Sequence, residues 1–189
     1  RIEQAGRKND VFRKPANEFV AKFVGVETLI EGIVLECRDN VCRVMVKSGN
    51  KIGNKNSFHE NSDYINYSYE NFESNDTTNK NIYHKNGHKI EFFIVADAKP
   101  GENVILAIRP EDVVLYNIQM SHEISSAMNS FRGVITDIQD IGIFKKVEID
   151  CGFKLVSFVT QNSIERLGIE PGKNITASIK ASSIHMFKS

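Results

Sequence analysis

Residues 131–160 of the chain read FRGVITDIQDIGIFKKVEIDCGFKLVSFVT. Short apolar and β-branched runs alternate in it with polar turns, which predicts successive short strands. Two similar runs follow before the end of the chain. The five predicted strands are Phe131–Ile138, Phe144–Cys151, Lys154–Thr160, Asn174–Lys180 and Ser183–Phe187. This number of short strands in about sixty residues is typical of a small OB-type barrel.

A short helix is predicted inside this barrel, over Ser163–Leu167. Asn162 followed by Glu165 forms a capping-box pattern, and Gly168 is suited to ending the helix. The sequence of residues 170–173, EPGK, predicts a turn before the last strands.

The upstream half also predicts β-structure. Residues 28–37 and 41–47 form a hairpin pattern around the turn at 38–40, and further runs occur at 89–97, 104–108 and 112–116. Before them, Pro15 in a first turn, an apolar face of Phe19, Val20 and Phe23, and Gly25 as a stop predict one short amphipathic helix. The expected fold is therefore all-β, with two OB-like units, a short N-terminal helix and a short helix in the second barrel.

Residues 50–88 differ from their surroundings in composition. This segment contains ten asparagines and no Val, Leu, Ala or Met. Because it offers little aliphatic surface to bury, we interpret it as an insertion in the first unit, either a loop or a small aromatic lid or hairpin.

Charge and cysteine usage exclude several classes of protein. The 24 basic residues balance the 24 acidic ones and there is no Trp, which argues against an OB-fold nucleic-acid binder with a basic groove and stacking aromatics. The sequence shows no secretion signal and no apolar run of membrane-spanning length. The three cysteines, Cys37, Cys42 and Cys151, are expected to be reduced core thiols of a cytoplasmic protein.

Nothing in the sequence indicates catalysis. The pattern Gly168-x-x-x-Gly172-Lys173 is one residue short of a phosphate-binding loop, and Asn174 replaces its Ser or Thr. No nucleophile–base set or paired carboxylate site is evident. His84 and His88, with His59 earlier, are a weak candidate for metal binding in the insertion, and the alternative is a solvated loop.

Small polar donors in the second unit form a candidate anion site. Hydroxyls, turn amides and one lysine suit a tetrahedral dianion, which accepts hydrogen bonds on every oxygen. On chemistry alone, ordinary solvent-facing strands and turns account for them better than an anion site does. The candidate oxoanion-binding residues are Ser126, Ala127, Met128, Asn129, Thr160, Ser163, Lys180, Ala181 and Ser182.

These segments resemble a molbindin (Mop) domain. The resemblance is carried by residues 126–135 (SAMNSFRGVI), by 159–163 (VTQNS), by 167–172 (LGIEPG) and by 179–183 (IKASS). It implies molybdate or tungstate binding, with both chains of a homodimer contributing and no further cofactor required. Many molbindin domains have arginine where this chain has Met128.

The first half is similar to the region that follows the nucleotide-binding domain in ABC importer ATPases. The similarity rests on Ile2–Gly6, Asp10–Pro15, Phe19–Gly25 and the sequence IRPEDV of residues 108–113. It implies a regulatory TOBE/Mop region, cytoplasmic and peripheral at the membrane, that partners an ATPase domain and a permease and inhibits import when oxoanion is abundant. The alternative is a ligand-free dimerisation scaffold of a sugar, polyamine or iron importer.

The implied division has four parts. Residues 1–25 are the end of the ATPase domain with a linker helix, 26–117 the first TOBE-like unit, 118–125 a linker and 126–189 the Mop-like barrel.

Overall fold

The computed structural model describes residues 1–47, 90–117 and 126–188. The predicted insertion, residues 50–88, lies wholly outside these residues, as do His59, His84 and His88. The helices are α1 (Lys8–Arg13), α2 (Glu18–Phe23) and α3 (Gln161–Leu167), with single 3-10 turns η1 (Pro110–Asp112) and η3 (Ala181–Ser183). The strands are β1 (Thr28–Arg38), β2 (Val41–Val46), β3 (Glu91–Val95), β4 (Asn103–Ile108), β5 (Val114–Tyr116), β6 (Asn129–Asp140), β7 (Lys145–Asp150), β8 (Lys154–Val159), β9 (Asn174–Ile179) and β10 (His185–Lys188).

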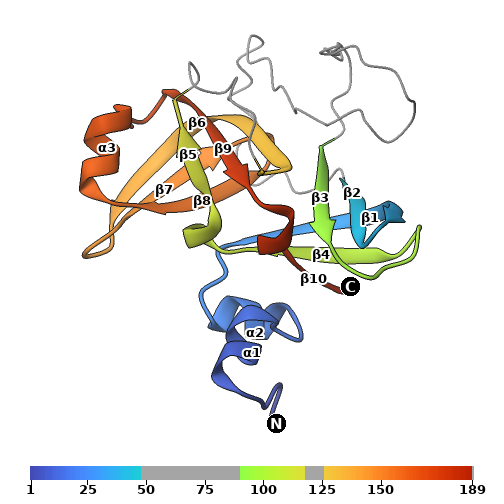
Figure 1. Cartoon of the computed structure of the whole chain (residues 1–189). Helices are drawn as coiled ribbons and strands as arrows, with labels where there is room; N and C mark the ends of the chain where they lie inside the picture. Colours follow the sequence, from blue (N-terminus) through green and yellow to red (C-terminus); the bar gives the residue numbers. More distant parts are fainter. Residues whose placement is uncertain (48–89, 118–125, 189) are drawn as a thin grey trace, which may run out of the picture.

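The strands form two five-stranded sheets that lie side by side (Figure 1). The first has the order β10-β4-β1-β2-β3 and the second the order β5-β9-β6-β7-β8. The predicted all-β fold with two barrel-like units is confirmed.

The two sheets exchange a strand, which corrects the predicted strand content of the units. β5, expected to close the first unit, pairs with β9 in the second sheet, with Leu115 opposite Ala177. β10, expected in the second barrel, pairs with β4 in the first sheet, with Met186 opposite Leu106. Local alternation identifies a strand, but it does not specify which sheet edge receives it.

One hydrophobic core joins the sheets. Phe92 of β3 packs against Phe131 of β6 and Phe153, with ring centroids 4.7 and 5.3 Å away. Phe131 and Phe153 meet edge to face at 5.1 Å. Because aromatic rings bury large apolar areas, this triad stabilises the two sheets as one body.

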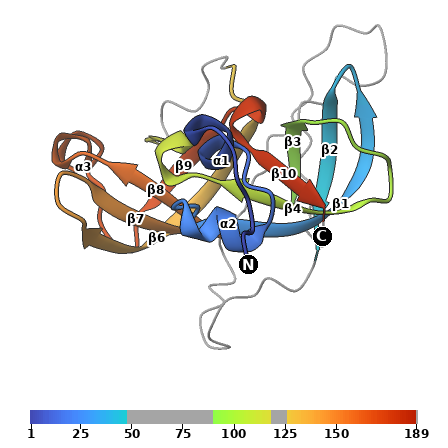
Figure 2. The same cartoon turned by 90° about the horizontal axis from the view of Figure 1, so that it is seen from below.

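The N-terminal segment differs from the single predicted helix. Asn17 caps α2, since its Oδ1 accepts from the Val20 amide at 3.0 Å, and Pro15 lies before the helix. Both Phe19 and Phe23 are exposed, at 67% and 84% of their surface. Val20, the remaining residue of the predicted face, is buried, and it packs with Ala21 and Val24 against β4 and β10. Figure 2 views the molecule from the side of these helices.

The helix in the second unit starts earlier than predicted. Thr160, not Asn162, is the N-cap, and its side chain accepts from the Ser163 amide. At the other end Gly168 adopts the left-handed conformation with φ of 59°, which confirms it as the helix stop. Lys173 N–H donates to the Glu170 carbonyl at 3.1 Å, so the predicted turn is also present.

Two of the three cysteines are not reduced thiols. Cys37 and Cys42 lie opposite each other in the β1–β2 register and form a disulfide, with Cα atoms 4.0 Å apart. The expectation of reduced thiols is wrong for this pair because the hairpin register brings the two residues together. Cys151 is a buried free thiol, as expected, and burial raises its pKa.

Within the described part of the chain, no helix has both the length and the apolar character needed to cross a bilayer.

Candidate functional site

The predicted site residues fall into two groups. The first, here called the strand-end cluster, combines residues 126–129 at the start of β6 with residues 180–182 after β9. The β6–β9 register pairs Asn129 with Ile179, so Met128 and Lys180 adjoin that pair. The second group, the helix-start cluster, consists of Thr160 and Ser163 at the beginning of α3.

Asn129 is almost completely buried, with 1% of its surface exposed. Its Oδ1 accepts from the Phe93 amide at 2.7 Å. Its Nδ2 donates to the carbonyls of Phe93 at 2.8 Å and Ile179 at 3.3 Å. Both amide hydrogens are therefore engaged with the backbone, so the expected donor role of this side chain does not fit this conformation. Asn129 instead fixes the two halves of the strand-end cluster to β3.

Lys180 supplies the positive charge of the strand-end cluster. It is exposed and precedes η3, and its carbonyl accepts from the Ser183 amide at 3.0 Å. Within residues 1–47, 90–117 and 126–188, no hydrogen bond or salt bridge is found for its ammonium group. Ser126 and Ser182 are also exposed, whereas Ala181 is buried. The cluster thus combines one available cation with neutral hydroxyl donors on a fixed backbone.

The helix-start cluster consists of two adjacent hydroxyls. The Oγ1 of Thr160 and the Oγ of Ser163 are 3.1 Å apart. Thr160 Oγ1 also accepts from the Ser163 amide at 3.3 Å. Accepting this bond leaves the Thr160 hydroxyl able to donate its own hydrogen, because a hydroxyl is both donor and acceptor.

The two clusters lie at opposite ends of β6. This strand runs from Asn129, beside the end of β9, to Asp140, which pairs with Lys145. Lys145 also pairs with Val159, the residue before Thr160. Because a strand rises about 3.3 Å per residue, the length of β6 separates the clusters by much more than the size of one oxoanion. The predicted residues therefore do not form one site within a single chain (Figure 1).

Sequence reasoning missed the residues that connect this region to the rest of the molecule. Phe93 contributes only its backbone, for which a sequence carries no side-chain signal. Arg109, part of the IRPEDV motif, donates to the carbonyls of Phe12 and Val24 and so attaches the N-terminal segment. His185 contacts the Pro15 carbonyl.

No metal site is evident in the described ranges, where no group of three His, Cys, Asp or Glu side chains is arranged to hold an ion.

Residues 125–186 match the model of the TOBE domain, so this part of the chain is similar to a TOBE domain. The fold resembles a crystal structure of the cytoplasmic molybdate-binding protein ModG with molybdate bound, with a TM-score of 0.54 and 18% identity. That alignment covers 85% of this chain and 95% of ModG.

The relatives found by sequence similarity point to a narrower group of proteins. The chain is 27% identical over 188 residues to the molybdate/tungstate import ATP-binding protein WtpC of Pyrococcus abyssi. It is 29% identical over 191 residues to WtpC of Pyrococcus horikoshii. Each alignment covers 99% of this chain but 40% of the relative. The resemblance to the TOBE/Mop region of molybdate/tungstate importer ATP-binding subunits is thereby confirmed.

Proposed function

We propose that this chain is the oxoanion-sensing regulatory region of an ABC importer ATP-binding subunit, with molybdate or tungstate as its ligand. The supporting similarity comes from relatives that are named as molybdate/tungstate import ATP-binding proteins and from a fold shared with a molybdate-binding protein. The region itself is not an enzyme in this proposal. It acts by binding.

The observation that carries the proposal is the separation of the two donor clusters along β6. If the strand-end cluster of one chain faces the helix-start cluster of a second copy, both surround the same anion. A two-fold axis then generates two equivalent sites per homodimer. Lys180 provides charge on one side, while Thr160 and Ser163 provide hydroxyls on the other.

The proposal extends to the whole protein. An ATPase domain adjoining residues 1–25 would hydrolyse ATP to drive import through a permease partner. The ATPase subunit would lie at the cytoplasmic face of the membrane, bound to that permease. The first unit, residues 26–117, and the second, 126–189, remain the proposed division, with β5 and β10 exchanged between their sheets.

Inhibition of import follows if the anion binds only one arrangement of the dimer. A ligand at about a hundred times its dissociation constant stabilises its preferred state by about 2.7 kcal/mol. Typical allosteric couplings are about 1–3 kcal/mol, so this differential affinity suffices to shift the attached ATPase domains.

Calorimetric titration with molybdate, tungstate and sulfate tests this function. We expect heat from at least one of the two metal oxoanions. Absence of heat with both would favour the alternative, a ligand-free dimerisation scaffold of another ABC importer.

A further inference from the structure

We propose that β10 couples the strand-end cluster to the N-terminal helices. His185 and Phe187 are the positioning residues through which ordering of the cluster by a ligand stabilises the docked helices. This inference rests on the proposed function for the identity of the ligand. The coupling itself concerns contacts within the chain.

The connection begins directly after Lys180. Ala181 and Ile184, 5% and 4% exposed, are buried on either side of the exposed Ser182. Because buried side chains hold this segment at such short intervals, it cannot move independently of β10. A displacement of residues 180–182 therefore also displaces β10. β10 then pairs with β4 as an edge strand of the first sheet.

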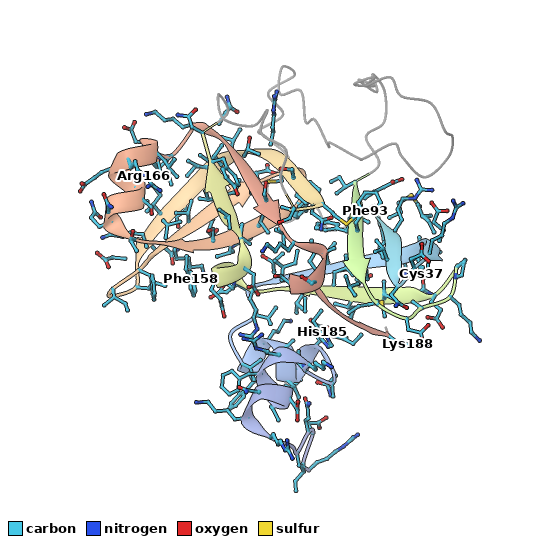
Figure 3. All side chains as sticks on the ribbon, in the orientation of Figure 1. Cys37, Phe93, Phe158, Arg166, His185 and Lys188 are labelled. Carbon is cyan, nitrogen blue, oxygen red and sulfur yellow. A yellow bond between two sulfur atoms is a disulfide. The ribbon has the colours of Figure 1, made fainter. Side chains whose placement is uncertain are left out.

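β10 contacts the N-terminal segment through two side chains. The Nε2 of His185 is 3.0 Å from the carbonyl oxygen of Pro15, and Figure 3 shows His185 between the sheet and the helices. Phe187, 8% exposed, belongs to the same apolar cluster as Val20, Ala21 and Val24 of the α2 region. The strand that follows the proposed anion cluster therefore also forms part of the surface on which α2 packs.

The far end of this helical segment is attached to the strands that carry the other cluster. The Nζ of Lys146 on β7 is 2.7 Å from the Oε2 of Glu27, just after α2. The Val156 amide on β8 donates to Thr28 Oγ1 at 3.2 Å. β8 leads directly to Thr160. The helices are thus held at one end by the segment after Lys180 and at the other by the strand before Thr160.

This arrangement makes α1 and α2 sensitive to both halves of an inter-chain anion site. A ligand that orders residues 180–182 stabilises β10, and through His185 and Phe187 it stabilises the docked helices. Linkage requires the reverse effect as well, so weakened docking of the helices loosens residues 180–184.

Hydrogen exchange measured by mass spectrometry on the dimer-competent chain tests the coupling. In the wild type, saturating tungstate is expected to slow exchange in residues 179–188 and in residues 16–24 together. His185→Ala should lose the response of residues 16–24, while its tungstate affinity by calorimetry falls by no more than about tenfold, the reciprocal effect of one lost hydrogen bond, since the lysine and hydroxyls remain.

Two variants serve as controls. His185→Gln offers an amide donor for the Pro15 carbonyl and should restore the helical response. Lys188→Ala removes an ion pair with Glu102, 2.9 Å long, from the same strand without touching the helices, and should behave as wild type.

A ligand-free arm separates the coupling from the proposed function. Without tungstate, His185→Ala should speed exchange of both residues 16–24 and residues 180–184 by about twofold to tenfold, the effect of one lost hydrogen bond. If calorimetry shows no heat of tungstate binding, the proposed function is contradicted. The exchange rates measured without ligand then test the coupling by themselves. Unchanged exchange in residues 16–24 of His185→Ala, or bound tungstate without any helical response in the wild type, overturns the coupling.

Discussion

The side chain of Asn129 bonds to both backbone groups of Phe93: its Oδ1 accepts from the Phe93 amide and its Nδ2 donates to the Phe93 carbonyl. The two hydrogen bonds have the same pattern as the pair of N–H···O bonds that two opposite residues of neighbouring antiparallel strands form. Here it joins β6 of the second sheet to β3 of the first. The phenyl ring of Phe93 is labelled in Figure 3 beside β3.

Replacing Asn129 by alanine should destabilise the chain by about 2–4 kcal/mol, because it leaves buried backbone groups without partners. The free energy of unfolding in urea measures this loss. Asn174→Ala is the matched control, since Asn174 is exposed at the first position of β9 and should change stability by less than about 0.5 kcal/mol. Equal effects of the two substitutions would contradict the structural role of Asn129.

The segment between β2 and β3 should be replaceable by a short linker. The Val46 amide donates to the Ile90 carbonyl at 2.9 Å, so the two ends that the segment connects are already hydrogen-bonded neighbours. A hairpin loop of two to five residues spans such a gap. We expect a chain with a four-residue Gly/Ser linker in place of residues 48–89 to unfold cooperatively, as followed by thermal denaturation. Non-cooperative melting would show that the segment contributes to the core.

The β1–β2 hairpin could be predicted because two alternating runs flank a tight turn, but the register that pairs Cys37 with Cys42 was not predicted. The exchange of β5 and β10 could not be predicted either, because three or four residues carry no signal for the sheet that accepts them. The predicted face of α2 is wrong for Phe19 and Phe23, whose size dominates the apolar pattern, and correct for Val20, which is buried with Ala21 against β4.

The candidate site shows the same limit. The motif similarity predicted the donors, and the structure places residues 126–129 beside 180–182. The backbone partners of Asn129 and the distance from Lys180 to Thr160 depend on how strands pair across the chain. These relationships are set by tertiary packing, which a single sequence does not specify.

Lys180→Met should weaken tungstate binding by about tenfold to a hundredfold, because a charge-assisted hydrogen bond contributes about 1.5–3 kcal/mol. Stability should change little, since the side chain is exposed. Lys47→Met, at an exposed position after β2, controls for loss of one positive charge and should retain wild-type affinity. Calorimetry measures both, and an unchanged affinity in Lys180→Met would remove this lysine from the site.

Stability should fall in mild acid through His185. Burial lowers the pKa of this imidazole below its ordinary value, and the nearby Lys14 and Arg109 lower it further, although the bond to Pro15 opposes them. The unfolded chain therefore binds this proton more readily than the folded chain. The stabilisation is complete above about pH 6.5, the unfolded pKa, and is lost as the pH falls below it.

Urea unfolding at pH 7.5, 6.5 and 5.5 tests this dependence in the wild type and in His185→Gln. The variant lacks the titrating group, so its stability should decline less between the first and last of these conditions. Parallel declines in both proteins would show that His185 is not the group responsible.

The most direct test of an oxoanion site shared by two chains is a mixing experiment between two variants. Lys180→Met damages the strand-end cluster, and the double variant Thr160→Val with Ser163→Ala damages the helix-start cluster. Each protein alone should bind tungstate weakly. In a dimer containing one chain of each kind, one site receives both damaged clusters and the other receives both intact clusters. Calorimetry after unfolding and refolding the two variants together should therefore recover high-affinity tungstate binding at one site per mixed dimer. Recovery of no high-affinity sites in mixed dimers would contradict a site formed between chains.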